Sequence, residues 1–164
     1  MKRLLLIFAV LLAGRVCAQN YTRDAGVRLG DFFSASYRQY NETDEAVEGL
    51  LFVGRHSITF TVMKEYFLPV FNHLSDNLWF QYGFGAHAGF RYTDSYRVLN
   101  RTYRLEKNTF TPLLGIDGLI GLEYRFPEFP FMVGIDMKPY FEYSTTPIFS
   151  IYLQSVGVSL KYRF

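Results

Sequence analysis

The sequence predicts an all-β fold, specifically an eight-stranded antiparallel up-and-down transmembrane β-barrel. The first observation is the period of two in residues 152–164, where apolar and polar side chains alternate as they do on the two faces of a strand. The second is that the two preceding strand-like segments repeat the pattern, with aromatics on the apolar face and charges on the other. The third is that the chain after the first 18 residues is rich in aromatics and glycines but has no apolar run long enough for a membrane helix. An apolar outer face and a polar inner face are typical of outer-membrane barrels.

The N-terminal segment has the parts of a secretory signal peptide. A short basic start precedes an unbroken apolar run at residues 4–13, and small residues follow it. We expect cleavage after Ala18, so that residues 1–18 are the signal peptide and residues 19–164 form a single barrel domain. Lipidation of Cys17 is the alternative, but a bulky cation stands two residues before it, where lipoprotein signals place a small residue.

Composition excludes several classes of site. Cys17 is the only cysteine, so the expected mature chain has no disulfide, cysteine nucleophile or zinc-thiolate site. The formal net charge of +2 includes three cations of the signal peptide, and their removal leaves +2 − 3 = −1. A nearly neutral domain gives no indication of nucleic-acid binding.

The first half of the domain predicts four strands joined by polar or glycine-containing turns. Each has apolar residues at alternate positions; Val47, Leu51 and Val53, for example, oppose Glu48. The predicted strands are residues 25–31, 33–40, 46–54 and 57–67, followed by a connection at 68–77 that contains Pro, Asn and Asp.

The second half predicts four further strands. The clearest alternation is in LWFQYGFGAHAGFRY, where an aromatic and alanine face opposes one with His87 and Arg91. Pro127 and Pro130 make one turn rigid. The predicted strands are residues 78–92, 114–126, 131–143 and 152–164, and residues 93–109 form the longest connection.

The number of strands depends on residues 25–40. They also fit one long strand, because the alternation does not change phase near Asp31. Outer-membrane barrels have an even number of strands, and placing both termini in the periplasm requires one. We therefore divide this stretch into two strands; the alternative source of an eighth strand is residues 96–105.

The same count sets the orientation. Periplasmic termini place the long connection outside, as expected for such barrels. Aromatics then gather at two rims, as at membrane interfaces. Those predicted at the periplasmic rim are Tyr124, Phe126, Phe131, Tyr162 and Phe164, and those at the outer rim are Phe90, Tyr92, Phe141, Tyr143 and Tyr152.

Charged residues of the inward face predict an internal salt-bridge network. Eight strands enclose an interior that side chains just fill, and a buried charge is costly unless it is paired. Six acids and seven cations are near balance; a small conducting pore is the alternative. The predicted network residues are Arg28, Arg38, Glu48, Glu65, His87, Arg91, Asp117, Glu123, Arg125, Asp136, Lys138, Glu142, Lys161 and Arg163.

No residue pattern predicts catalysis, a cofactor or a metal site. His73 and Ser75 have the His-x-Ser spacing used by outer-membrane lipid A deacylases, but they fall in a predicted periplasmic turn. His87 beside inward carboxylates could form an acid–base pair or a metal site, although a lone interior histidine is more often a hydrogen-bonded core residue.

The long connection contains four cations, Arg97, Arg101, Arg104 and Lys107, and two acids, which gives a net charge of 4 − 2 = +2. Facing outward, it could contact lipopolysaccharide phosphates or a partner surface. The alternative is a solvated loop.

Several stretches together resemble one protein family. They are GVRLGDFFSASYRQY, AVEGLLFVGRHSITFTVMKEYF, LWFQYGFGAHAGF, GIDGLIGLEYRFPEFPF, IDMKPYFEY and SVGVSLKYRF. The sequence resembles a family of small outer-membrane barrels from Bacteroidetes, similar in build to outer-membrane protein X and the opacity-type porins. The most specific parts are YGFGAHAGF and GIDGLIGLEY, whereas Phe32 and Phe33 depart from the small turn residues of relatives.

The resemblance implies eight strands and insertion by the barrel-assembly machinery. Leu160, Tyr162 and Phe164 resemble the signal that this machinery reads; the resemblance implies no catalytic residue. We therefore expect a non-enzymatic outer-membrane protein, structural or interacting through its outer face, with membrane lipid and lipopolysaccharide as neighbours. The alternatives are a lipid-modifying barrel enzyme and a narrow pore.

Overall fold

A computed structural model describes residues 22–30, 33–41, 44–54, 56–70, 75–98, 101–145, 149–153 and 155–164. Among these residues no helix is long and apolar enough to cross a membrane. The predicted signal peptide, with Cys17, lies outside the described residues, and so do His73 and Leu74.

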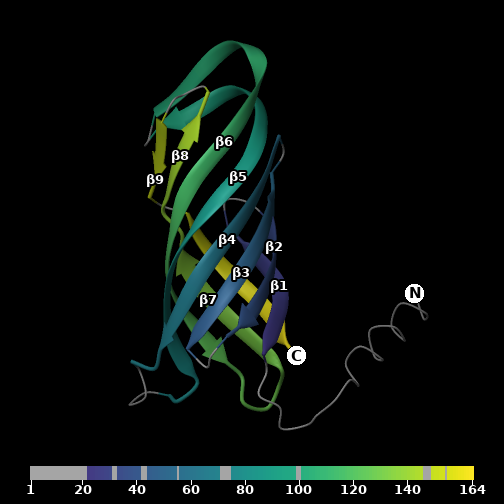
Figure 1. The fold of residues 1–164 in the computed structure, drawn as a ribbon, viewed down its shortest axis with the longest axis vertical. Helices are drawn as coiled ribbons and strands as arrows, with labels where there is room; N and C mark the ends of the chain where they lie inside the picture. The colour runs from purple at the N-terminus through teal and green to yellow at the C-terminus, as the bar shows by residue number, and fades with distance from the viewer. Residues whose placement is uncertain are drawn as a thin grey trace, which may run out of the picture.

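The described chain is a closed antiparallel β-barrel (Figure 1). Consecutive strands pair from β1 to β7, and β1 pairs with β10 to close the wall. The strands are β1 (Arg23–Leu29), β2 (Phe33–Tyr40), β3 (Glu45–Val53), β4 (Ser57–Leu68), β5 (Leu78–Val98), β6 (Arg101–Arg125), β7 (Phe131–Met137), β8 (Tyr140–Ser144), β9 (Phe149–Tyr152) and β10 (Val156–Arg163). The predicted fold class, an eight-stranded up-and-down barrel, is confirmed; β8 and β9 are short strands additional to it.

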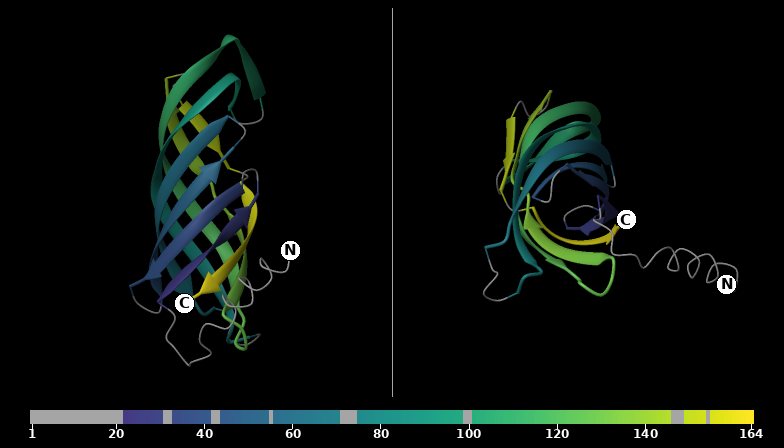
Figure 2. Two further views of the ribbon diagram at one scale, coloured as in Figure 1. Left: turned by 90° about the vertical axis from the view of Figure 1, so that its right-hand side faces the viewer. Right: turned by 60° about the horizontal axis from the view of Figure 1, so that its bottom comes forward.

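The two ends of the barrel differ in height and construction. The chain enters β1 and leaves β10 at one end, called here the terminal end (Figure 2). The β5–β6 hairpin projects from the other, called here the hairpin end, well beyond the short β1–β2 hairpin (Figures 1 and 2). At the terminal end, Arg23 and Phe164 exchange two backbone hydrogen bonds of 3.1 and 2.9 Å across the closing seam.

The first hairpin supplies the eighth strand. β1 and β2 pair antiparallel, with Val27 opposite Ala35, which confirms the division of residues 25–40. The alternative at residues 96–105 is wrong, because residues 96–98 belong to β5 and residues 101–105 belong to β6. The predicted connection at residues 93–109 is also wrong, since β5 extends to Val98 and β6 begins at Arg101, with a register shift between Thr93 and Ser95.

The predicted strand at residues 131–143 is interrupted. β7 and β8 keep one register against β6, with Met137 opposite Ile120 and Tyr140 opposite Asp117. The interruption falls at residues 138–139, where Pro139 has no N–H to donate to a ladder.

The predicted strand at residues 152–164 contains a β-bulge. The Lys138 N–H donates to the Ser155 carbonyl at 2.9 Å, yet Tyr140, two residues on, pairs with Tyr152 rather than with residue 153. One extra residue inverts the alternation of side chains. Tyr152, predicted to face outward, therefore shares the inward face with Tyr140, while Leu153 is 57% exposed.

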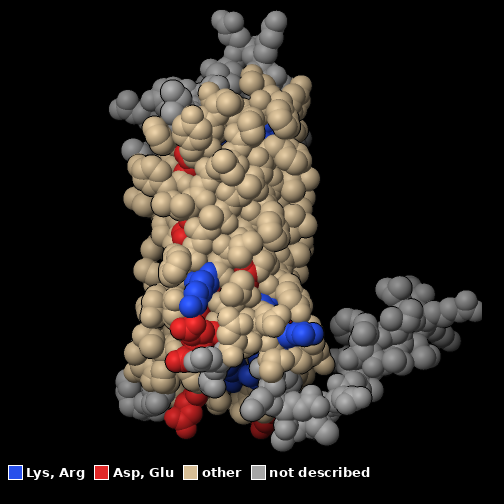
Figure 3. Space-filling model, viewed as in Figure 1, with Lys and Arg blue, Asp and Glu red and all other residues tan. Residues whose placement is uncertain are grey.

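The charged side chains lie mainly inside the barrel and the large apolar side chains lie mainly outside, the reverse of a soluble protein. Outward positions of the wall expose large apolar side chains, such as Phe84 and Ile116 at 61% and 66%. Figure 3 shows one face with few charges over most of its height, and with Lys, Arg, Asp and Glu gathered mainly toward the terminal end. Aromatic contacts on this outer surface include Phe131–Tyr162, Tyr124–Phe126, Phe90–Phe110 and Tyr143–Phe149.

Candidate functional site

The predicted network residues face the barrel interior. Arg28, Arg38, Glu48, Glu65, His87, Asp117, Glu123, Asp136, Lys138, Glu142 and Lys161 are buried. Three lie nearer the barrel ends and are only partly buried: the side chains of Arg91 and Arg125 are 25% and 12% exposed, and Arg163 donates from Nη2 to the Phe126 carbonyl at 2.9 Å. Most of these residues group into two clusters, one toward each end, while Arg28 and Asp136 form a separate ion pair.

The cluster toward the terminal end is built around Arg38 of β2. Its guanidinium lies 2.6 Å from Glu123 and 2.9 Å from Glu65, with Asp24 at 3.5 Å and Glu48 at 3.8 Å. All five side chains are at most 4% exposed. One cation thus joins carboxylates from four other strands, β1, β3, β4 and β6.

Two more cations complete this cluster. Lys161 forms an ion pair with Glu48, and Arg125 lies 2.8 Å from Glu123. The ring centroid of Phe67 lies 5.0 Å from the Arg38 guanidinium and 4.8 Å from that of Arg125, distances typical of cation–π contacts. Four carboxylates and three cations fill this part of the lumen.

An apolar group separates this cluster from the next along three strands. Leu50, Met63 and Leu119 pack together inside the barrel, with Phe52 against them. In β4 and β6 the apolar residue lies between polar residues of the two ends, whereas in β3 Leu50 lies between Glu48 and Phe52. On the opposite wall Arg28 and Asp136 form an ion pair of 2.7 Å.

Glycines make room for the large charged side chains. A Cβ on Gly157 would overlap the Arg28 guanidinium, and one on Gly115 would overlap the His87 ring. Glycine therefore occurs where a bulky side chain of a neighbouring strand lies against the backbone. Gly115 and Gly157 share the two-residue period of the inward Asp117 and Lys161, so alternation alone places them inside.

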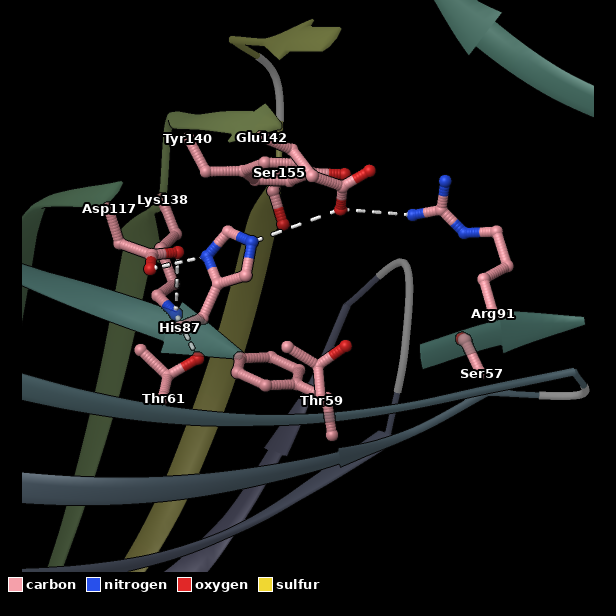
Figure 4. A pocket seen from close by; sticks show the side chains of 11 residues that line it. Ser57, Thr59, Thr61, His87, Arg91, Asp117, Lys138, Tyr140, Glu142 and Ser155 are labelled. Atoms are coloured by element: carbon pink, nitrogen blue, oxygen red, sulfur yellow. Dashed lines mark hydrogen bonds and ion pairs between the residues drawn. The ribbon is translucent and has the colours of Figure 1, made fainter. Parts of the chain in front are cut away.

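The cluster toward the hairpin end contains His87, Arg91, Asp117, Lys138 and Glu142 (Figure 4). His87 Nδ1 lies 2.7 Å from Asp117, and Lys138 lies 3.2 Å from the other oxygen of that carboxylate. The Glu142 Oε2 atom accepts from Arg91 Nη2 at 3.1 Å and faces His87 Nε2 at 3.8 Å. The five residues come from β5, β6 and β8 and from the break before β8.

This cluster lines a partly open cavity. Its other walls include Phe52, Thr61, Tyr140 and Ser155, and Tyr140 packs edge-on against His87 with centroids 5.7 Å apart. The cavity has a volume of about 60 Å³. It is therefore large enough for a small ligand.

The geometry favours binding over acid–base catalysis. Both ring nitrogens of His87 face carboxylates, so neither is directed at a hydroxyl that it could deprotonate. In the described part of the chain, no group of three or more His, Cys, Asp or Glu residues could hold a metal ion. Ser75 of the His-x-Ser pair accepts from the Asn77 N–H at 3.2 Å in the turn before β5.

The prediction omits Asp24, because the first predicted strand begins at residue 25. Asp24 lies in β1, is fully buried, and belongs to the Arg38 cluster. The signal was present in the sequence, since Asp24 is four residues before Arg28 and therefore on the same face of an extended strand.

The remaining predicted residues lie on the outer surface or in the hairpin. Leu160 is exposed on β10, Tyr162 packs against Phe131, and Phe164 follows the strand. Of the four cations predicted in a loop, Arg97 belongs to β5, and Arg101, Arg104 and Lys107 belong to β6; their side chains lie outside the described part. Comparisons with protein-family models, curated proteins and solved structures found no match to the chain.

Proposed function

We propose that this chain is an integral β-barrel protein of a bacterial outer membrane, with both ends periplasmic, a filled polar interior and no enzymatic activity. The observation that supports it best is the exposed apolar wall, which runs round the barrel while the charges lie inside. Contiguous exposed apolar patches on soluble monomers rarely exceed a few hundred Å². A lipid environment removes this wall from water and leaves the paired charges in the lumen.

We propose that the role of the protein in the cell envelope is structural or consists of an interaction through its outer face. The projecting β5–β6 hairpin carries the net positive charge that favours lipopolysaccharide phosphates. The filled lumen argues against a wide channel, and the engaged ring nitrogens of His87 argue against a lipid-modifying enzyme. Insertion by the barrel-assembly machinery through Leu160, Tyr162 and Phe164 is part of the proposal and rests on the resemblance alone.

Gel mobility tests membrane insertion and closure together. Protein from carbonate-washed outer membranes is run with and without boiling, and a closed barrel is expected to migrate differently in the two samples. Recovery in the soluble periplasmic fraction, with one mobility for both samples, would contradict the proposal.

Cysteine labelling tests the orientation. The expected mature chain has no cysteine, so His56→Cys at the hairpin end and Glu128→Cys at the terminal end each introduce a single exposed thiol. A membrane-impermeant maleimide is expected to label His56→Cys on intact cells. Glu128→Cys is expected to react only after the outer membrane is permeabilised. The reverse pattern would invert the topology.

Shortening the hairpin separates the function of the hairpin from that of the barrel. Thr93 and Thr109 pair directly, so removal of residues 95–107 leaves Asp94 and Asn108 as a two-residue turn. We expect unchanged heat-modifiable mobility and weaker binding of lipopolysaccharide to the purified protein. A full-length control replaces the four hairpin cations by Gln. Undiminished binding by both variants would refute an interaction through the hairpin.

A further inference from the structure

We infer that the cavity at the hairpin end binds a small zwitterion, with Glu142 receiving a primary ammonium group and Arg91 an anionic group. This inference goes beyond the proposed function and does not depend on the β5–β6 hairpin. It depends on the geometry of Glu142, on the charge balance of the cavity and on its size.

The Glu142 carboxylate has an unused acceptor in a buried place. Its side chain is 4% exposed. Oε2 is engaged by Arg91 and His87, whereas Oε1 has no hydrogen-bond partner among the described residues. Leaving a buried polar atom unpaired is costly, and most so for a charged group. An N–H donor of a ligand would remove this cost with a charge-assisted hydrogen bond.

A second unpaired group lies beside it. Ser150 of β9 pairs directly with Glu142 of β8, so their side chains are on the same face. Ser150 is also buried, and its Oγ atom has no partner in the described part of the chain. Ser150 is not among the residues that line the cavity, so the oxygen that this wall offers to a ligand is that of Glu142.

The remaining charges favour a ligand that carries one positive and one negative group. Asp117 is engaged by Lys138 and His87, and Arg91 and Glu142 form the other ion pair of the cavity. Arg91 is 25% exposed, against 4% for its partner. A simple cation would be repelled by Arg91, and a simple anion by Glu142, whereas a zwitterion satisfies both.

The size of the cavity limits the ligand. A partly open cavity of about 60 Å³ suits a short carbon skeleton with two polar groups. Tyr140 and Phe52 supply an apolar wall for that skeleton. A small α-amino acid and the phosphoethanolamine group of a lipid share the required chemistry.

Ligand-observed NMR of the protein purified in detergent tests the inference without any substitution. Alanine and O-phosphoethanolamine are the zwitterionic probes; propionate, ethylammonium and glycerol are the controls. We expect saturation transfer to at least one zwitterion and at least tenfold weaker binding of all three controls. Tighter binding of alanine identifies a free amino acid as the source, and tighter binding of O-phosphoethanolamine a lipid headgroup.

Variants assign the contacts. Glu142→Gln is expected to weaken zwitterion binding at least tenfold, whereas Lys64→Gln, on the outer surface beside Glu45, leaves it unchanged. Equal binding of propionate, ethylammonium or glycerol would overturn the inference, as would wild-type affinity in a folded Glu142→Gln variant. A barrel with heat-modifiable mobility that binds neither zwitterion overturns this inference alone; loss of that mobility in the wild type contradicts the proposed function instead.

Discussion

The Arg38 guanidinium lies 2.6 Å from the Glu123 carboxylate across the lumen, although 85 positions separate them in the sequence. β2 and β6 are not neighbours in the wall, so this contact ties opposite sides of the barrel together. Both side chains are almost completely buried, at 1% and 2% exposed. The stability of the barrel should therefore depend on this one cation.

Replacement of Arg38 by Met is expected to destabilise the barrel by about 3–5 kcal/mol, because buried carboxylates then lose their partner. Urea unfolding of the protein refolded into detergent micelles measures the loss. Lys64→Gln is the matched control, since it breaks the exposed ion pair with Glu45, and a much smaller effect is expected. Equal midpoints for the two variants would contradict a central role of Arg38.

A methyl group at Gly157 is expected to displace the Arg28 guanidinium and weaken its ion pair with Asp136. Gly157→Ala should cost about 1–3 kcal/mol, as is usual for overpacking. Gly49→Ala is the control, because a Cβ there meets its nearest neighbour, the Phe60 ring, at 3.7 Å. The same urea unfolding assay compares the stabilities of the two variants. Wild-type stability of Gly157→Ala would contradict the prediction, because the Arg28 side chain would then adopt another conformation without loss of stability.

The register shift between β9 and β10 predicts which of residues 152 and 153 faces lipid. Single cysteines at Tyr152 and Leu153 are labelled with a fluorophore in liposomes that contain brominated lipid. Strong quenching is expected for Leu153→Cys and weak quenching for Tyr152→Cys, because Leu153 faces outward. An unbroken strand would give the opposite order, so this experiment decides directly between the two registers.

The filled lumen predicts an electrically silent protein. The Arg38 cluster, the apolar group of Leu50, Met63 and Leu119, and the Arg28–Asp136 ion pair fill the middle of the described lumen. Planar bilayers containing the purified protein are expected to show no stepwise conductance. Reproducible single-channel steps, absent from a mock preparation, would instead support a narrow pore.

Much of the architecture follows from local patterns. Alternation of period two identifies the inward charges of β2, β3 and β6, such as Arg38, Glu48 and Glu123, because every residue of a regular strand has its face fixed by its neighbours. It also places β1 and β2 correctly once an even strand number is required. Asp24 was available to the same reasoning and was missed only because the strand was started too late.

What the sequence alone determined about this protein is the face of most strand residues and the near balance of its inward charges. The tertiary structure decided the partners: that Arg38 joins four carboxylates, and that Glu142 lies beside Arg91 and His87 with an oxygen left over. It also decided the reversal at Tyr152 and the length of the β5–β6 hairpin. Period two is a local property, whereas bulges and cross-lumen contacts depend on the register between strands, which is fixed only when the barrel closes.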